Sequence, residues 1–435
     1  MTNEERKERY MNRNIKLFPA LCALTWDIIF VWTISMMFFS TQKGLEPSQI
    51  IALDSILMLA GCILVVPVGK LFQNVSPIVA TRIGMCGYGG YLLLVIFGTS
   101  YPIFIIAQLF LAFGYSVMSV KTNSVLTNSL QVVKRDKDYQ RTYGKGVSIF
   151  YAIESIGAIL ITYVYNWQPY MAYWMSFAIV VGTILFSFLF VEPKKFQDKN
   201  VDIKQTQELA KSKKPDSYFK ILASLFFIAL LVFMFLMRGV LSIAGSSFKL
   251  YLQGLIDVGT LPVWAFGYIY AAGRLCVSLA SNFQFKFNLK FGVRSIIIIA
   301  VASIVTFVLN GLMFIYCDLP YLNLVVISVS SFIQMSLFPI CRIFVNNYMQ
   351  VCIHKKNIER AYSIRTMVEY LGYAAVSGLY AAILGVNNDH YGFTSLIHIS
   401  IYIIPIIIAT AVFIHQLCRK HAQKYTIIRT EYTED

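Results

Sequence analysis

Charged residues are scarce in this sequence, and their scarcity excludes an ordinary soluble domain. Only 14% of the 435 residues are Asp, Glu, Lys or Arg, whereas 57% are hydrophobic. A soluble domain usually has about 25% charged residues and about 45–50% apolar residues. The composition therefore indicates a protein that lies largely in a membrane.

Several motifs of enzymes and metal proteins are also missing. The chain contains no phosphate-binding loop of the form G-x-x-x-x-G-K-[ST], so we do not expect it to hydrolyse nucleotides. The eight cysteines include no C-x-x-C pair and no spacing typical of a metal site or a disulfide framework. The five histidines form neither an H-x-x-x-D nor an H-E-x-x-H pattern, which leaves a membrane-embedded lipid-modifying enzyme as a remote alternative. We therefore predict no catalytic residue, no metal and no cofactor.

The sequence does contain a series of long apolar runs. A helix needs about 20 such residues to cross the hydrocarbon core of a membrane. The runs lack the alternating pattern of barrel strands, and backbone groups in lipid must be paired within the segment, so the runs are expected to be helices. They lie at about 17–39, 49–71, 78–97, 102–126, 147–165, 171–191, 219–248, 263–284, 295–316, 321–346, 366–385 and 393–417. The predicted fold is an all-α membrane protein with twelve transmembrane helices.

Positive charges are distributed unevenly between the apolar runs. The chain has 37 Lys and Arg against 22 Asp and Glu, a formal net charge of +15. Residues 1–16 and every second loop contain 31 of the 37 basic residues, whereas the opposite loops contain only Lys43 and Lys249. Because basic residues accumulate in cytoplasmic loops, we predict a multi-pass protein of the plasma membrane with both termini in the cytoplasm. The same pattern explains the net charge without a nucleic-acid partner.

A long polar segment divides the chain into two parts. Residues 192–220 are rich in charge and separate the sixth apolar run from the seventh. We predict an N-terminal six-helix half at 1–191, a cytoplasmic linker at 192–218 and a C-terminal six-helix half at 219–435.

Short matching segments indicate that the two halves are parallel repeats. Arg141-Thr142-Tyr143 precedes Glu154-Ser155-Ile156-Gly157 in the fifth run, and Arg360-Ala361-Tyr362 precedes Glu369-Tyr370-Leu371-Gly372 in the eleventh. Counting back from the ends of the first and seventh runs places Asp27 beside Met237 and Arg238. The fold is therefore expected to consist of two pseudo-symmetric halves.

Two six-helix halves joined by a cytoplasmic linker resemble the major facilitator superfamily of secondary transporters. In that superfamily the loop after the second span typically reads G-x-x-x-D-R-x-G-R-R. Here Gly69 begins the corresponding loop, Gln73 replaces the acidic residue and Asn74 replaces the basic residue, while the equivalent loop of the second half contains Gly292 and Arg294. The resemblance implies that these residues belong to loops that change conformation during transport, and we expect the protein to be a monomer.

Three acidic residues interrupt the apolar runs. Asp27, Glu154 and Glu369 lie well inside their runs, where an ionisable side chain is costly and is a candidate functional residue. Buried carboxylates can take up and release protons, so we predict that these three residues couple transport to an ion. The alternative is that they form structural ion pairs with buried basic residues.

Four basic residues also lie inside the apolar runs. Arg238, Arg274, Lys121 and Arg342 outnumber the three acids, which favours a substrate bearing a carboxylate or phosphate group. For Lys121 and Arg342 an alternative is that their long side chains reach the cytoplasmic headgroups. The resemblance places the first and seventh helices opposite each other, so Asp27 and Arg238 are expected to approach one central cavity.

Two tryptophans flank the first of these acidic residues. Trp26 and Trp32 lie on either side of Asp27 in the first run. Both are candidates to cover the ring of a bound substrate, and packing within the protein is the alternative.

We predict a secondary active transporter that moves a small organic solute by alternating access and is coupled to protons. The solute is expected to be anionic or zwitterionic. A multidrug exporter of the same superfamily is the alternative, although the glycine-proline signature that such exporters carry in the fifth span is absent from residues 148–165. The expected partners are a small-molecule substrate, protons or another coupling ion, and membrane lipids.

Overall fold

The structure, a computed structural model, describes residues 3–72, 74–135, 138–192, 225–292, 294–317, 319–352, 358–387 and 393–420. Within these ranges the chain forms helices and no strand. Gln73 and all of the predicted linker except Glu192 lie outside the described residues. The predicted all-α fold is confirmed.

Each predicted apolar run overlaps one or two helices, and several helices extend beyond the predicted bounds, α6 and α14 by eight residues at their starts and α10 by nine at its end. In chain order they are α1 (Asn3–Thr25), α2 (Val31–Lys43), α3 (Pro47–Leu71), α4 (Pro77–Phe97), α5 (Tyr101–Val132), α6 (Tyr139–Trp167), α7 (Met171–Phe186), the 3-10 helix η2 (Ser187–Leu189), α10 (Leu225–Asp257), α11 (Val263–Phe291), α12 (Arg294–Tyr316), α13 (Pro320–Cys352), α14 (Ile358–Asn387) and α15 (Phe393–Lys420). Ten of the described helices are long and apolar enough to cross a membrane, and α15 contains a shorter apolar stretch, Ile403–Leu417. The count of twelve spans stays a prediction.

The first apolar run is predicted as one continuous helix over 17–39, and the structure differs. It is broken between α1 and α2, and residues 26–30 are not helical. Phe30 has a φ of 77°, in the left-handed region that costs a residue with a Cβ about 1–2 kcal/mol. Hydropathy predicts the length of a span but carries no information about such a turn inside it.

The chain divides into two compact units. Unit 1 contains Met1–Trp32, Ile63–Gly157 and Val164–Pro215, and unit 2 contains Thr33–Cys62, Ala158–Tyr163 and Asp216–Asp435. The predicted boundary between two six-helix halves lies outside the described residues and stays a prediction.

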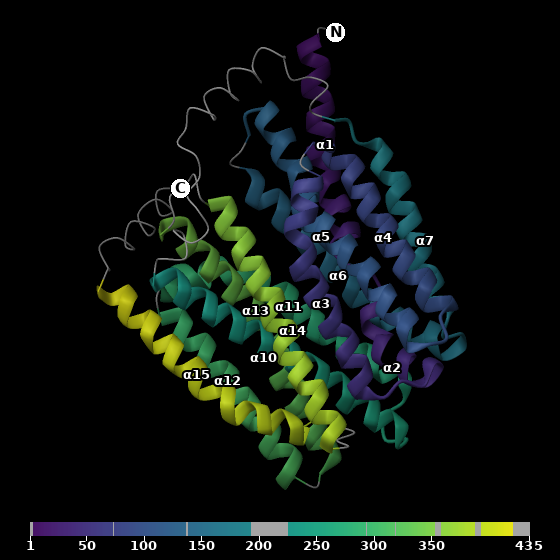
Figure 1. Cartoon of the computed structure of the whole chain (residues 1–435), viewed down its shortest axis with the longest axis vertical. Coiled ribbons are helices and arrows are strands. Elements are labelled where there is room, and N and C mark those ends of the chain that lie inside the picture. The colour runs from purple at the N-terminus through teal and green to yellow at the C-terminus, as the bar shows by residue number, and fades with distance from the viewer. Residues whose placement is uncertain are drawn as a thin grey trace. The chain divides into compact units, whose positions relative to one another are not determined.

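Glycines bring α4 and α5 close together in unit 1. A Cβ at Gly87 would lie 2.9 Å from the carbonyl oxygen of Phe110, and one at Gly114 would lie 2.5 Å from the ring of Tyr88. Small residues at such positions let two membrane helices approach closely. Helix α7 packs against α4 beside this pair (Figure 1).

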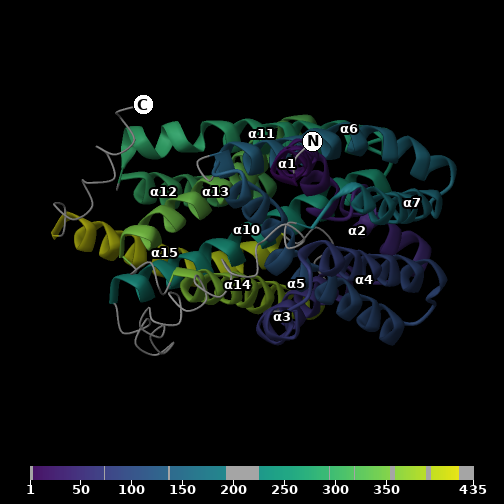
Figure 2. The ribbon, with the colours of Figure 1, turned by 90° about the horizontal axis from the view of Figure 1, so that it is seen from above.

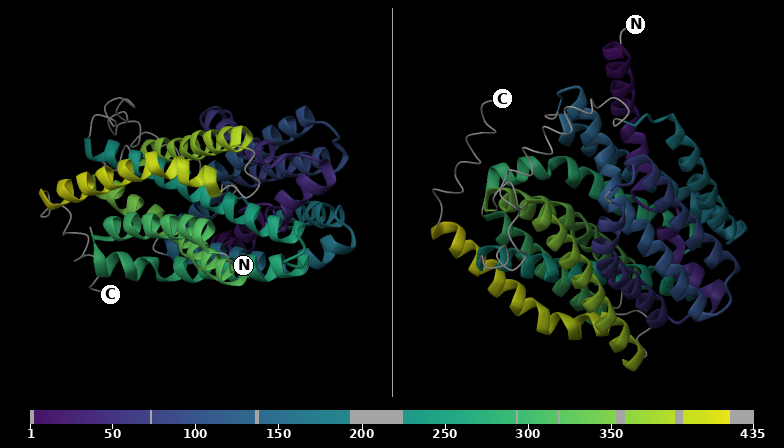
Figure 3. Two further views of the ribbon diagram at one scale, coloured as in Figure 1. Left: turned by 90° about the horizontal axis from the view of Figure 1, so that it is seen from below. Right: turned by 45° about the horizontal axis from the view of Figure 1, so that its top comes forward.

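In unit 2, α10 packs against both α13 and α14 and lies between them in Figure 2. The crossing of α10 and α14 is tight, because a Cβ at Gly372 would lie 2.3 Å from the carbonyl oxygen of Phe235. Two serine contacts continue this interface: Ser242 Oγ lies 3.1 Å from Ser377 Oγ, and Ser247 Oγ lies 2.5 Å from the Tyr380 hydroxyl. Helix α15, yellow in Figure 3, lies at the periphery of the unit and packs against α12.

Some helices expose an apolar stripe. On α12 the exposed residues Val301, Val305, Val308 and Leu312 recur at helical spacing on one face. In water such a stripe would be unfavourable, whereas lipid tails are a suitable neighbour. We expect this face of α12 to contact lipid.

Candidate functional site

The break between α1 and α2 surrounds the carboxylate of Asp27 with hydrogen-bond donors. Asp27 Oδ1 accepts bonds from the backbone N–H of Ile28 at 2.7 Å, from Trp32 Nε1 at 2.6 Å and from the hydroxyl of Tyr115 on α5. Trp32 Nε1 also lies 3.2 Å from the Tyr115 hydroxyl. Three donors on one oxygen suit an ionised carboxylate, which accepts hydrogen bonds and donates none.

Neighbouring helices hold the break in place. Ser176 on α7 donates a 2.7 Å hydrogen bond to the carbonyl oxygen of Ile29, which lies in the break. The ring of Phe30 lies over Gly157 on α6, where a Cβ would come within 2.6 Å of the ring. The irregular backbone is therefore paired and packed inside protein, the condition under which non-helical backbone is tolerated at membrane depth.

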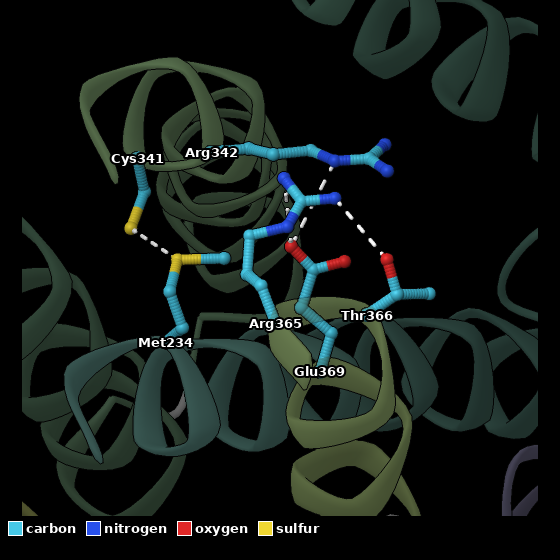
Figure 4. Close-up of polar contacts among 6 residues, drawn as sticks. All are labelled: Met234, Cys341, Arg342, Arg365, Thr366 and Glu369. Atoms are coloured by element: carbon cyan, nitrogen blue, oxygen red, sulfur yellow. Dashed lines mark hydrogen bonds and ion pairs between the residues drawn. The ribbon is translucent and has the colours of Figure 1, made fainter. Parts of the chain in front are cut away.

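Unit 2 contains a carboxylate between two arginines (Figure 4). Glu369 Oε1 lies 3.5 Å from Arg365 Nη1 and 3.7 Å from Arg342 Nε. Glu369 and Arg365 are 4% and 5% exposed, whereas the side chain of Arg342 is 36% exposed. Arg365 Nη2 also contacts Thr366 Oγ1 at 3.4 Å. Both distances to Glu369 exceed those of an ordinary hydrogen bond, so the group is an ion-pair cluster rather than a bidentate pair.

A third arginine lies beside this cluster and is held by aromatic rings. The guanidinium carbon of Arg238, on α10, lies 4.6 Å from the ring centre of Phe338 and 4.8 Å from that of Tyr373. Within the described residues, the side chain of Arg238 forms no ion pair and no hydrogen bond. Cation–π contacts orient a guanidinium without neutralising its charge or occupying its in-plane N–H groups.

The three arginines and the glutamate form one electrostatic neighbourhood. Phe338 and Arg342 are one turn apart on α13, and Glu369 and Tyr373 are one turn apart on α14. Tyr370 interacts electrostatically with all four charged groups. Cys341 and Met234, whose sulfur atoms are 3.6 Å apart, join α13 to α10 beside the cluster (Figure 4). We call Arg238, Arg342, Arg365 and Glu369 the arginine cluster; its positive excess suits an anionic ligand.

Arg274 belongs to a different group of unit 2. Its guanidinium lies 4.8 Å from the ring centre of Tyr270 and donates to the Tyr270 hydroxyl. Lys249 Nζ lies 5.5 Å from the same ring. The structure thus brings Arg238 and Arg342 together but places Arg274 with Lys249.

The remaining predicted residues belong to unit 1 or to the segments predicted as loops. Glu154 on α6 is buried, Lys121 on α5 is partly buried, and Trp26 packs against Tyr143 and Phe150 at ring-centre distances of 5.9 and 6.3 Å. Among the residues predicted to lie in loops, Gly69 lies inside the last turn of α3, which ends at Leu71. Asn74 and Arg294 are exposed, and Gly292 has a φ of 50°.

Sequence reasoning missed Arg365 and Tyr115. Starting the eleventh run at residue 366 assigned Arg365 to a loop, although its position four residues before Glu369 is a signal for an ion pair on one helix. Tyr115 gives no such signal, because 88 residues separate it from Asp27.

Comparisons with known proteins agree with this architecture. A sequence model of the Major Facilitator Superfamily matches residues 17–377. A search of curated proteins finds no match.

Two solved transporter structures are similar in fold. The nucleoside transporter NupG, in a single-residue variant, aligns with a TM-score of 0.69 and 15% identity over 93% of this chain and 98% of that chain. A bacterial homologue of the human lysosomal transporter Spinster, in an inward-facing and unoccupied conformation, aligns with a TM-score of 0.64 and 10% identity over 96% and 98%. Because the family model extends from α1 into α14, this multi-pass membrane protein belongs to the major facilitator superfamily.

Proposed function

We propose that the protein is a secondary transporter that moves a small organic anion, or a zwitterion with an anionic group, across the plasma membrane by alternating access. The main support for this proposal is the environment of Arg238. Its guanidinium is held between two aromatic rings and is not paired with a carboxylate among the described residues. An arginine inside an apolar helix is costly unless an anion compensates it. A carboxylate or phosphate of the substrate would supply that compensation.

The similarity to the nucleoside transporter NupG supports transport of a small solute through the fold alone. At 15% identity it does not extend to the ligand. The arginine cluster favours an anion instead. Arg238 and Arg342 are the proposed binding residues of the cluster, while Arg274 and Lys121 are proposed to assist from their own positions on α11 and α5.

We further propose that proton movement drives accumulation of the substrate. Asp27, Glu154 and Glu369 are the proposed coupling residues, because each is a carboxylate inside an apolar run, Asp27 in the break between α1 and α2 and the two glutamates in helices. Glu369 contacts Arg342 and Arg365 directly, so its charge and that of a bound anion would influence each other.

The test begins with the purified full-length protein and a panel of small metabolites, each acid matched to its uncharged amide. A ligand that binds the native state raises the melting temperature. We expect acids to stabilise the protein and their amides not to, and we expect labelled acid to enter proteoliposomes. Arg238→Gln should abolish both effects.

Arg135→Gln is the matched control. Arg135 is an exposed arginine of unit 1 that pairs with Asp138 on the surface, so its loss should change little. If amides or lipophilic cations stabilise the protein as well as acids do, and Arg238→Gln has no effect, the anion assignment is wrong and a multidrug exporter is favoured.

A further inference from the structure

We propose that Arg342 is a second anion-binding residue which Glu369 holds in the empty protein, and that the site therefore takes a dianion. A dicarboxylate or a phosphate monoester has this chemistry. The inference rests on the proposed function, because it specifies the charge of the anion that Arg238 binds.

Arg342 is close to the proposed anchor Arg238. Phe338, which contacts Arg238, lies one helical turn before Arg342 on α13. Tyr373, the other ring that contacts Arg238, lies one turn after Glu369 on α14. Arg238 and Arg342 are therefore both positioned by neighbouring turns of the same two helices, α13 and α14.

The geometry of the contact between Arg342 and Glu369 would let Arg342 leave Glu369 and bind a substrate anion instead. Only Nε of Arg342 faces Glu369, at 3.7 Å, and the two terminal nitrogens point away from the carboxylate (Figure 4). The planar fork that binds carboxylate or phosphate with two parallel hydrogen bonds is thus not directed at Glu369. At 36% exposure, the Arg342 side chain also has room to move, unlike the buried Arg365.

Arg365 lowers the free-energy cost of moving Arg342 away from Glu369. It lies on the same helix as Glu369, one turn earlier, and contacts the same oxygen at 3.5 Å. When Arg342 turns toward a substrate, Glu369 keeps a positive partner, so no buried carboxylate is left unpaired. Arg365 is therefore a positioning residue, and Arg342 is the residue that touches substrate.

The two arginines favour a ligand with two negative charges. A dianion can place a negative charge on Arg238 and on Arg342 at the same time, whereas a monoanion supplies only one.

The experiment compares three probes by thermal stabilisation of the full-length protein in detergent at about pH 8. Succinate and inorganic phosphate are predominantly dianions there, and butyrate is a monoanion of the same chain length as succinate. In the wild type we expect at least one dianion to bind about tenfold or more tightly than butyrate. In Arg342→Gln this preference should disappear, while Arg135→Gln should keep it.

The variant Glu369→Gln tests whether Glu369 competes with the substrate for Arg342 or forms a permanent structural ion pair with it. If Glu369 competes with the substrate for Arg342, the amide should bind the dianion as tightly as the wild type or more tightly. Weaker binding by a folded Glu369→Gln protein would overturn the exchange. If Arg342→Gln fails to fold, Arg342→Lys keeps the charge but loses the fork and should weaken dianion binding.

The failures are distinguishable. Equal binding of butyrate and the dianions, lost in Arg238→Gln, would overturn this inference and leave the proposed function standing. Binding of butyrate alone would have the same meaning. Absence of stabilisation by all three probes and by every acid of the metabolite panel would overturn both.

Discussion

At the scale of single residues, Asp27 is held by three hydrogen-bond donors in the break of the first span. Its Oδ1 accepts from Tyr115, Trp32 and the N–H of Ile28. Asp27→Asn keeps an acceptor oxygen for these donors, whereas Asp27→Leu removes it. Each buried donor left without an acceptor costs about 1–3 kcal/mol, so we expect the Leu variant to be much less stable than the Asn variant. Thermal unfolding in detergent measures the difference, and equal melting temperatures would show that the network does not hold the break.

The three carboxylates predict a separable defect in coupling. A residue that carries the proton should, as its neutral amide, lose accumulation of substrate against a gradient while keeping substrate exchange. We expect this of at least one of Asp27→Asn, Glu154→Gln and Glu369→Gln. Uptake and counterflow in proteoliposomes separate the two activities. Uphill accumulation by all three variants would exclude proton coupling through these residues.

At the scale of helices, two glycines occupy corresponding positions in the repeated Glu-x-x-Gly segments. Gly157 accommodates the ring of Phe30 beside the broken first span, and Gly372 accommodates the carbonyl of Phe235 on α10. Gly157 thus fits α6 against the break in the first span, and Gly372 fits α14 against α10.

The tight crossing of α10 and α14 predicts a cost for adding one methyl group. In Gly372→Ala the Cβ would lie 2.3 Å from the carbonyl oxygen of Phe235, so the helices must separate. Overpacking of this kind costs about 1–3 kcal/mol, more than the gain of about 1 kcal/mol in helix propensity. We expect a lower melting temperature. Gly182→Ala on α7 is the control, because nothing lies within 4 Å of its Cβ position and its stability should be unchanged or higher. Equal melting temperatures of the two variants would show that α10 and α14 are not in tight contact at Gly372.

At the scale of the whole molecule, the distribution of basic residues predicts the orientation in the membrane. With 31 of 37 Lys and Arg in the N-terminus and alternate loops, both termini and the 192–218 linker should face the cytoplasm. Reporter fusions at the C-terminus, in the linker and at Gly259, between α10 and α11, measure the sidedness of each segment. We expect cytoplasmic signals from the first two and an external signal from the third. An external signal from the linker would reverse the assignment.

Much of the architecture follows from local properties of the sequence. A run of about 20 apolar residues must be helical in lipid whatever its neighbours are, because its backbone groups have no other partners. The boundaries of α4 and α12 therefore agree with prediction within a residue or two. The ionisable residues Asp27, Arg238, Arg342 and Glu369 were likewise recognisable from sequence, because a charge inside an apolar run is conspicuous wherever it points.

The grouping of those residues depends on contacts between helices that are distant in sequence. Tyr115 reaches Asp27 across 88 residues, and hydropathy cannot distinguish it from any other tyrosine of α5. The break at Phe30 exists because Ser176 and Gly157, on two other helices, supply its hydrogen bond and its space. Arg342 meets Glu369 because α13 and α14 each pack against α10, a relation that helix periodicity within either segment does not specify. The apolar character and the charge of a residue can be read from its own position in the sequence. Which side chains contact each other depends on two helix surfaces and is decided only when the helices pack.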